Sequence, residues 1–115
     1  MAFSEFEKRM YSKLASEYCE ENGPPPHLYD QLQLLSKLEE QSIIIYELRP
    51  SFKQPAEKIE WMVAKATYLK STKKWKIYYQ AATLKWKSYE PCPEVNRLEE
   101  FFMLLEVDAY HHFFA

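Results

Sequence analysis

A single glycine, Gly23, stands among the 115 residues of this chain. A loop that cradles phosphate needs several glycines, because its backbone must approach the ligand closely, so the glycine-rich nucleotide motifs are excluded. Only two cysteines occur, Cys19 and Cys92, and they are too far apart for a CxxC or zinc-ligand spacing. We therefore expect two reduced thiols in a cytoplasmic protein, with a single disulfide as the alternative.

Long apolar runs are also missing. No segment approaches the ~20 apolar residues of a transmembrane span, and a polar amphipathic segment follows the N-terminus where a signal peptide has its apolar stretch. Neither a nucleophile elbow nor an HExxH pattern occurs, and the three histidines lack metal-ligand spacing. We expect no membrane partner, no catalytic residue, no cofactor and no metal, which favours a non-enzymatic protein.

Acidic residues are absent from the whole stretch between Trp61 and Tyr89, which carries seven lysines. Every other part of the chain is acidic, so that the formal net charge is −2 and the pI is near 5.9. Aromatic residues alternate with these lysines, most clearly in Lys74-Trp75-Lys76-Ile77-Tyr78-Tyr79 and Leu84-Lys85-Trp86-Lys87-Ser88-Tyr89. This pattern predicts one positive surface on a negative body.

Apolar residues recur at helical spacing near both ends of the chain. The first helix is expected over residues 4–22, beginning with a capping box of Ser4 and Glu7. We expect it to end at Gly23 in a left-handed conformation, before three prolines. A second helix is expected over residues 93–109. The aromatic cluster that follows, Tyr110-His111-His112-Phe113-Phe114, is expected to dock onto the sheet, with a subunit contact as the alternative.

About five strands are expected within residues 30–90, joined as an antiparallel meander. Their approximate bounds are Leu32–Leu38, Ser42–Phe52, Trp61–Lys70, Trp75–Tyr79 and Lys85–Tyr89. Together with the helices they predict one α+β domain, residues 1–115, with both helices packed on one face of the sheet.

Strand alternation assigns side chains to the two faces of this sheet. Pairing of Lys70 with Trp75 places Met62, Ala64, Ala66, Tyr68, Trp75, Ile77 and Tyr79 toward the helices, and a four-residue second turn places Trp86 there too. The open face is then expected to carry Lys65, Lys76, Tyr78, Lys85, Lys87 and Tyr89, together with Glu47 and Arg49 and with Ile43, Ile45, Val63 and Leu69.

Three functions are compatible with such a face. Exposed Ile43, Ile45, Val63 and Leu69 would favour a homodimer or a protein partner, which we take as the leading hypothesis. Lysines beside Tyr78 and Tyr89 would favour single-stranded nucleic acid, although the acidic pI argues against it. Glu47, Arg49 and Lys65 could instead bind a small anion. The alternative is that the face has no specific function and is a solvent-exposed sheet surface, on which the aliphatic parts of lysine side chains cover tyrosine rings.

The order of these features resembles a family of small bacterial cytosolic proteins, domain of unknown function 3024. The motifs that carry the resemblance are the helix ending before the prolines, Tyr46-Glu47-Leu48-Arg49-Pro50, Ala64-Lys65-Ala66-Thr67-Tyr68, Trp75-Lys76-Ile77-Tyr78-Tyr79 and Lys85-Trp86-Lys87-Ser88-Tyr89-Glu90-Pro91. The resemblance extends from about Tyr18 to Phe114. It implies a stand-alone bacterial domain and supplies neither an activity nor site residues.

Overall fold

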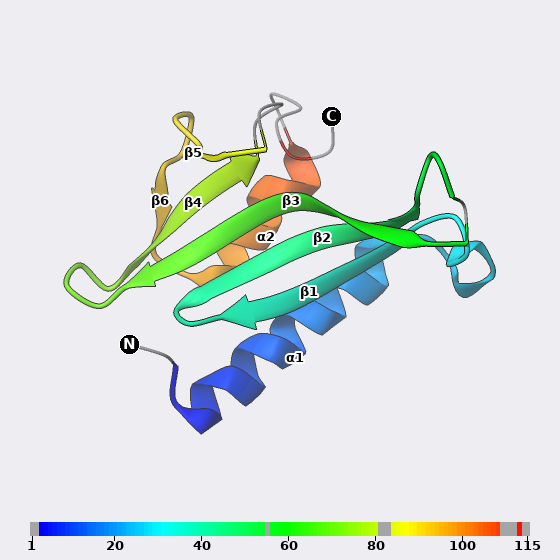
Figure 1. The fold of residues 1–115 in the computed structure, drawn as a ribbon. Helices are drawn as coiled ribbons and strands as arrows, with labels where there is room; N and C mark the ends of the chain where they lie inside the picture. Colours follow the sequence, from blue (N-terminus) through cyan, green and yellow to red (C-terminus); the bar gives the residue numbers. More distant parts are fainter. Residues whose placement is uncertain (1–2, 55, 81–83, 109–112, 114–115) are drawn as a thin grey trace.

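A computed structural model of the chain describes residues 3–54, 56–80, 84–108 and 113. It is an α+β fold in which two helices lie behind an antiparallel sheet (Figure 1). In chain order the elements are α1 (Glu5–Asn22), the 3-10 helix η1 (Pro26–Leu28), β1 (Gln33–Glu39), β2 (Ser42–Pro50), β3 (Lys58–Leu69), β4 (Lys74–Gln80), β5 (Trp86–Ser88), β6 (Glu94–Val95) and α2 (Leu98–Val107).

The first helix begins as predicted. The backbone N–H of Glu7 donates to the Ser4 hydroxyl, while the Glu7 carboxylate accepts from the Ser4 backbone N–H, which completes a capping box. The helix also ends at Gly23 as predicted, but the predicted left-handed conformation is wrong, because Gly23 has φ −83° and ψ 174°, which is extended backbone. Glycine is needed there for another reason: a Cβ on Gly23 would stand 2.6 Å from the carbonyl oxygen of Cys19.

The sheet is a meander with the strand order β1-β2-β3-β4-β5, and β6 pairs with β4. Tyr68 lies opposite Trp75, two positions from the predicted pairing with Lys70, so the predicted side-chain parity of this hairpin holds. A bulge interrupts the β2–β3 register between Ile45 and Tyr46. The extra β3 residue at that bulge is Val63, which moves Met62 onto the opposite face from the one predicted.

The core lies between the sheet and the two helices. Ile43 and Ile45 are fully buried in it and Val63 is 1% exposed, so the prediction that these three residues lie on the open face is wrong. The register explains the error: β1 must bury Leu34 and Leu38, and Leu38 pairs with Ile43 across the first hairpin. The small Ala64 and Ala66 beside them allow close packing, as predicted.

The face prediction for β5 is also wrong. Trp86 pairs with Gln80 and Ser88 pairs with Tyr78, which puts Trp86 on the open face. Tyr89 is instead 3% exposed and packs with its ring centroid 4.7 Å from that of Phe113. The predicted turn through 81–84 lies outside the described residues except for Leu84, which has φ 63°.

The second helix is shorter than predicted, because Glu94 and Val95 form β6 and α2 begins only at Leu98. Its Phe102 stacks on Tyr18 of α1 with 5.0 Å between ring centroids, which joins the two helices. Phe113 is buried in the same chain, as expected for a docked aromatic end. The other members of the predicted terminal cluster lie outside the described residues.

Candidate functional site

Lysine and aromatic side chains meet on the face of the sheet that the helices leave open. The Lys65 ammonium lies 5.0 Å from the ring centroid of Tyr78 and 4.8 Å from that of Trp86. Lys76 approaches the same Tyr78 ring at 5.7 Å. The registers Lys65–Tyr78 and Gln80–Trp86 hold these side chains on neighbouring strands β3, β4 and β5. We name Lys65, Lys76, Tyr78 and Trp86 the lysine–aromatic platform.

Burial affects the charge at the centre of this platform. The side chains of Lys65, Lys76, Tyr78 and Trp86 are all half-buried, although no helix covers them. Partial burial lowers the pKa of Lys65 from its ordinary value. Its ammonium has therefore lost part of its hydration, and the nearby Glu39 offsets part of this effect.

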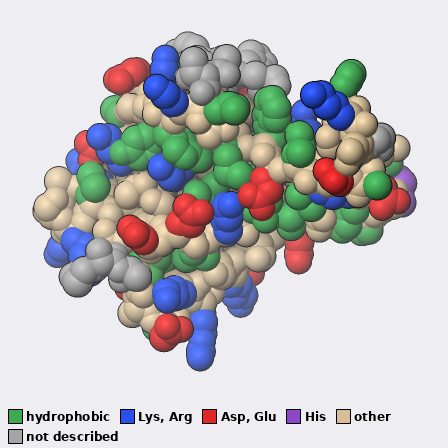
Figure 2. Space-filling view, viewed as in Figure 1, with side chains coloured by type: hydrophobic (Ala, Val, Ile, Leu, Met, Phe, Trp, Pro, Cys, Tyr) green, Lys and Arg blue, Asp and Glu red, His purple; other side chains and the backbone are tan. Residues whose placement is uncertain are grey.

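The adjoining part of the open face, over β1 and β2, has a different character. Lys37 lies 5.1 Å from the Tyr46 ring centroid and 3.0 Å from a carboxylate oxygen of Glu60. The hydrogen bond that Lys37 donates to Glu60 raises the pKa of Lys37, so its ammonium stays charged and is already paired with a carboxylate. Beside it, Glu39, Glu40, Ser42 and Lys65 line a hollow of about 580 Å³. Figure 2 shows red and blue side chains interspersed over this half of the face.

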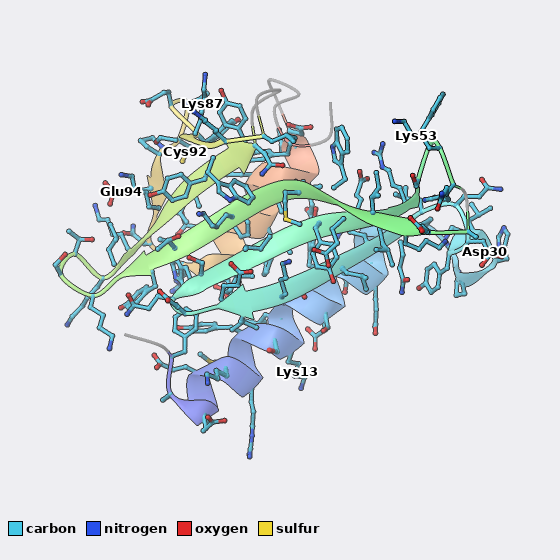
Figure 3. The ribbon with its side chains drawn as sticks, viewed as in Figure 1. Lys13, Asp30, Lys53, Lys87, Cys92 and Glu94 are labelled. Atoms are coloured by element: carbon cyan, nitrogen blue, oxygen red, sulfur yellow. The ribbon has the colours of Figure 1, made fainter. Side chains whose placement is uncertain are left out.

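Three predicted platform residues lie elsewhere. Lys87 pairs with Tyr79, whose side chain points toward the helices, and Lys87 projects from β5 at the margin of the sheet (Figure 3). Lys85 is exposed and precedes β5, and Tyr89 belongs to the core. Leu69 is half-buried and lies on the open face, opposite Lys74. It is the one residue of the predicted apolar patch that lies on this face.

The predicted anion site of Glu47, Arg49 and Lys65 is not assembled. Glu47 pairs across β1 with the buried Leu34 and so faces the helix side, whereas Lys65 pairs with Ile44 on the open face. The Glu47 carboxylate forms a salt bridge with the Arg49 guanidinium, which also lies 5.4 Å from the Trp61 ring centroid. This pair satisfies a carboxylate that is only 8% exposed.

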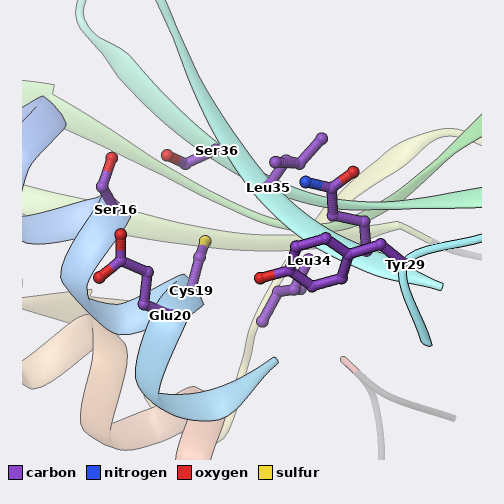
Figure 4. A pocket seen from close by; sticks show the side chains of 8 residues that line it. Ser16, Cys19, Glu20, Tyr29, Leu34, Leu35 and Ser36 are labelled. Carbon is purple, nitrogen blue, oxygen red and sulfur yellow. The ribbon is translucent and has the colours of Figure 1, made fainter. Parts of the chain in front are cut away.

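A cavity of about 220 Å³ lies on the helix side of the sheet, between α1 and β1 (Figure 4). Ser16, Cys19 and Glu20 of α1 face Leu34 and Ser36 of β1 across it. Burial raises the pKa of the Cys19 thiol to about 11, so this cysteine is not an activated nucleophile. Both cysteines are free, which agrees with the expectation of reduced thiols.

The helices carry the negative charge. Glu17 and Glu21 of α1 line a hollow of about 210 Å³ together with Glu99 and Glu106 of α2. Within the described ranges, no three histidine, cysteine or acidic side chains are placed to hold a metal ion. Nor does any helix in those ranges have the length and apolar character needed to cross a membrane.

Sequence reasoning missed Trp86, Tyr46 and Lys37 as members of the open face. The signal for Lys37 and Tyr46 was present in the first hairpin, whose two-residue turn of Glu40 and Gln41 sets Lys37 opposite Ile44. For Trp86 the deciding feature is the register between β4 and β5, which the sequence of the intervening turn does not reveal.

Comparison with known proteins gives a family and no activity. No curated protein and no solved structure matches the chain. One family model, described as Domain of unknown function (DUF3024), matches residues 3–115. Because that match covers nearly the whole sequence, the chain belongs to the DUF3024 family.

Proposed function

We propose that this protein is a non-enzymatic, cytoplasmic binding domain that takes single-stranded nucleic acid on its lysine–aromatic platform. The observation that carries the proposal is the position of the Lys65 ammonium over two neighbouring rings, Tyr78 and Trp86, on a sheet face without a helix. Aromatic rings beside cations are the combination that single-strand binding surfaces use, because bases stack on the rings while phosphates meet the charges.

The distribution of charge supports this assignment despite the acidic pI. The seven lysines of residues 61–89 have no acidic neighbour within that segment, while Glu17, Glu21, Glu99 and Glu106 of α1 and α2 form an acidic cluster behind the sheet. The part of the open face over β3, β4 and β5 is therefore more basic than the helix side of the molecule. Lys37 is paired with Glu60, and Glu39 and Glu40 border Lys65 on the β1 side, so a strand path from Lys65 over β4 and β5 is favoured over a path across β1.

Stacking and charge make separable contributions. Each base on an aromatic ring contributes about 1–3 kcal/mol by alanine substitution. Each lysine–phosphate contact adds roughly −0.7 to the slope of log K against log salt for a single strand. Two lysines, Lys65 and Lys76, thus predict a slope of about −1.4, and affinity should weaken as salt rises.

The experiment measures fluorescence anisotropy of a labelled twelve-nucleotide DNA of mixed sequence, and of the matching RNA, at several salt concentrations. We expect saturable binding at low salt. The double variant Lys65→Glu/Lys76→Glu should abolish it, because each phosphate contact becomes a repulsion. The melting temperature of each variant is measured alongside, because Lys65 is half-buried with its ammonium over two rings and the comparison requires a folded variant.

A control with the same change in net charge distinguishes a local site from general electrostatics. Arg9→Glu/Lys13→Glu alters two exposed residues of α1, on the helix side of the molecule. It should retain most of the wild-type affinity. The proposal is refuted if both double variants lose affinity equally, or if neither nucleic acid binds at low salt. The lysines would then belong to a solvent-exposed surface without a binding role.

A further inference from the structure

β1 forms one edge of the sheet and is open along its outer side. In the part of the chain that the structure describes, its backbone is hydrogen-bonded to β2 and to no other element. Proteins usually protect such an edge with a proline, a bulge or an outward lysine. β1 contains no proline and pairs without a bulge, and its one lysine, Lys37, is turned onto the sheet face toward Glu60.

The first hairpin determines which backbone groups are free. Its two-residue turn is closed by Glu39 and Ser42, and such a closing pair is hydrogen-bonded. Hydrogen-bonded and outward-facing residues alternate along an antiparallel strand. Leu34, Ser36 and Leu38 therefore direct their N–H and C=O groups away from β2, at the spacing that an added strand requires.

Space is present beside these groups. The cavity between α1 and β1 adjoins the outer edge at Leu34 and Ser36, and the α1 side chains that line it include the small Ser16 and Cys19 (Figure 4). α1 packs chiefly on β1 and extends past its free edge, so it forms a shelf behind the position of a further strand (Figure 1). A helix beside an open edge strand is the arrangement by which peptide-binding domains receive an extended segment.

We propose that an extended peptide segment of another protein adds to β1 as a further strand. Such a segment would pair its backbone with Leu34, Ser36 and Leu38 and direct alternate side chains over the cavity. Among the described residues that line the cavity, Glu20 is the charged one, so a lysine or arginine at one of those positions is favoured.

The test is a selection of linear twelve-residue peptides, displayed on phage, against the immobilised protein. Enriched peptides are then synthesised and titrated against two variants of one position. Ser36→Pro removes the outward N–H, and proline is tolerated on a strand edge where that group faces away from the neighbour. Ser36→Ala removes only the hydroxyl. We expect Ser36→Pro to weaken binding at least about tenfold and Ser36→Ala to change it less than about twofold.

A second variant keeps the test decisive if Ser36→Pro does not fold. Ser16→Tyr fills the cavity from the exposed side of α1 and leaves the strand intact, so it should also weaken binding about tenfold or more. Enriched peptides should contain lysine or arginine. The proposal is overturned if no peptide is enriched, or if both blocking variants bind the enriched peptides as well as the wild type does. It is also overturned if the wild-type protein is a dimer that Ser36→Pro dissociates, because β1 would then pair with a second copy.

Discussion

At the scale of single residues, Gly23 is fixed by lack of space rather than by backbone conformation. It lies where α1 ends, its N–H donates to the Cys19 carbonyl oxygen at 2.9 Å, and its dihedral angles are open to any residue. A Cβ would meet that carbonyl oxygen at 2.6 Å and the Cβ of Leu34 at 3.2 Å. The first neighbour is backbone of the last turn of α1 itself, so relief requires that turn to distort.

Gly23→Ala should therefore lower the free energy of unfolding by about 1–3 kcal/mol, the usual cost of overpacking. Urea denaturation of both proteins measures the difference. At an unstrained site without the clash, the same change stabilises a protein by about 0.4–1 kcal/mol, through the unfolded chain. A neutral or stabilising result would contradict the crowding of Gly23 against the Cys19 carbonyl oxygen.

Cys19 and Cys92 differ in their surroundings, and this difference can be measured. Cys19 is 8% exposed in the wall of the α1–β1 cavity, where burial raises its pKa to about 11. The thiolate is the reactive form, so its fraction at pH 8 is on the order of one in a thousand. Cys92 is only half-buried.

Iodoacetamide at pH 8 should therefore alkylate Cys92 well before Cys19, as read by mass spectrometry of proteolytic fragments. Because the pKa of Cys19 is raised, its reaction should accelerate only as the pH rises toward about 11. Denatured protein, in which both thiols are exposed, provides the control and should show similar rates. Rapid modification of Cys19 in the folded protein at pH 8 would contradict its burial.

At the scale of elements, β2 shows why a run of similar residues hides the orientation of a strand. Ile43, Ile44 and Ile45 are equally apolar, so alternation within β2 does not choose a face. The choice comes from β1, where Leu34 and Leu38 must be buried and bring Ile43 and Ile45 with them. Ile44 is left on the open face, opposite Lys65, yet is only 3% exposed.

Ile45→Ala should destabilise the protein by about 2–5 kcal/mol, because it leaves a cavity in the main core. Leu69→Ala, on the open face and half-buried, should cost about 1 kcal/mol or less. Thermal or urea denaturation compares the two. Similar small losses for both variants would mean that the faces of the sheet have been assigned the wrong way round.

The sequence predicts the helices and strands better than the face of the sheet on which each side chain lies, because the face depends on the register between strands. The capping box at Ser4 and the parity of the β3–β4 hairpin depend on local chemistry, and both are confirmed. The side of the sheet that carries Val63 depends on a bulge, and that of Trp86 on a turn register. Insertion or deletion of one residue at the bulge or in the turn moves the adjoining side chains to the opposite face of the sheet, and no local sequence pattern marks that position. Of the predicted platform, Lys65, Lys76 and Tyr78 are brought together.

At the scale of the whole molecule, the fold separates two kinds of surface. An acidic cluster of α1 and α2 lies on one side of the sheet and the lysine–aromatic platform lies on the other, while β1 forms one edge of the sheet. The two proposed sites use different groups: rings and ammonium groups on β3, β4 and β5, but backbone groups on β1. Loss of one need not affect the other, so each proposal can fail alone.

The central claim is that single-stranded nucleic acid binds the open face over β3, β4 and β5. Its most direct test is a heteronuclear NMR titration of the wild-type protein with a twelve-nucleotide single strand at low salt. The account predicts that chemical-shift changes concentrate at Lys65, Lys76, Tyr78 and the indole N–H of Trp86, and that added salt reverses them. Unchanged spectra, or changes centred on α1 and α2, would contradict it.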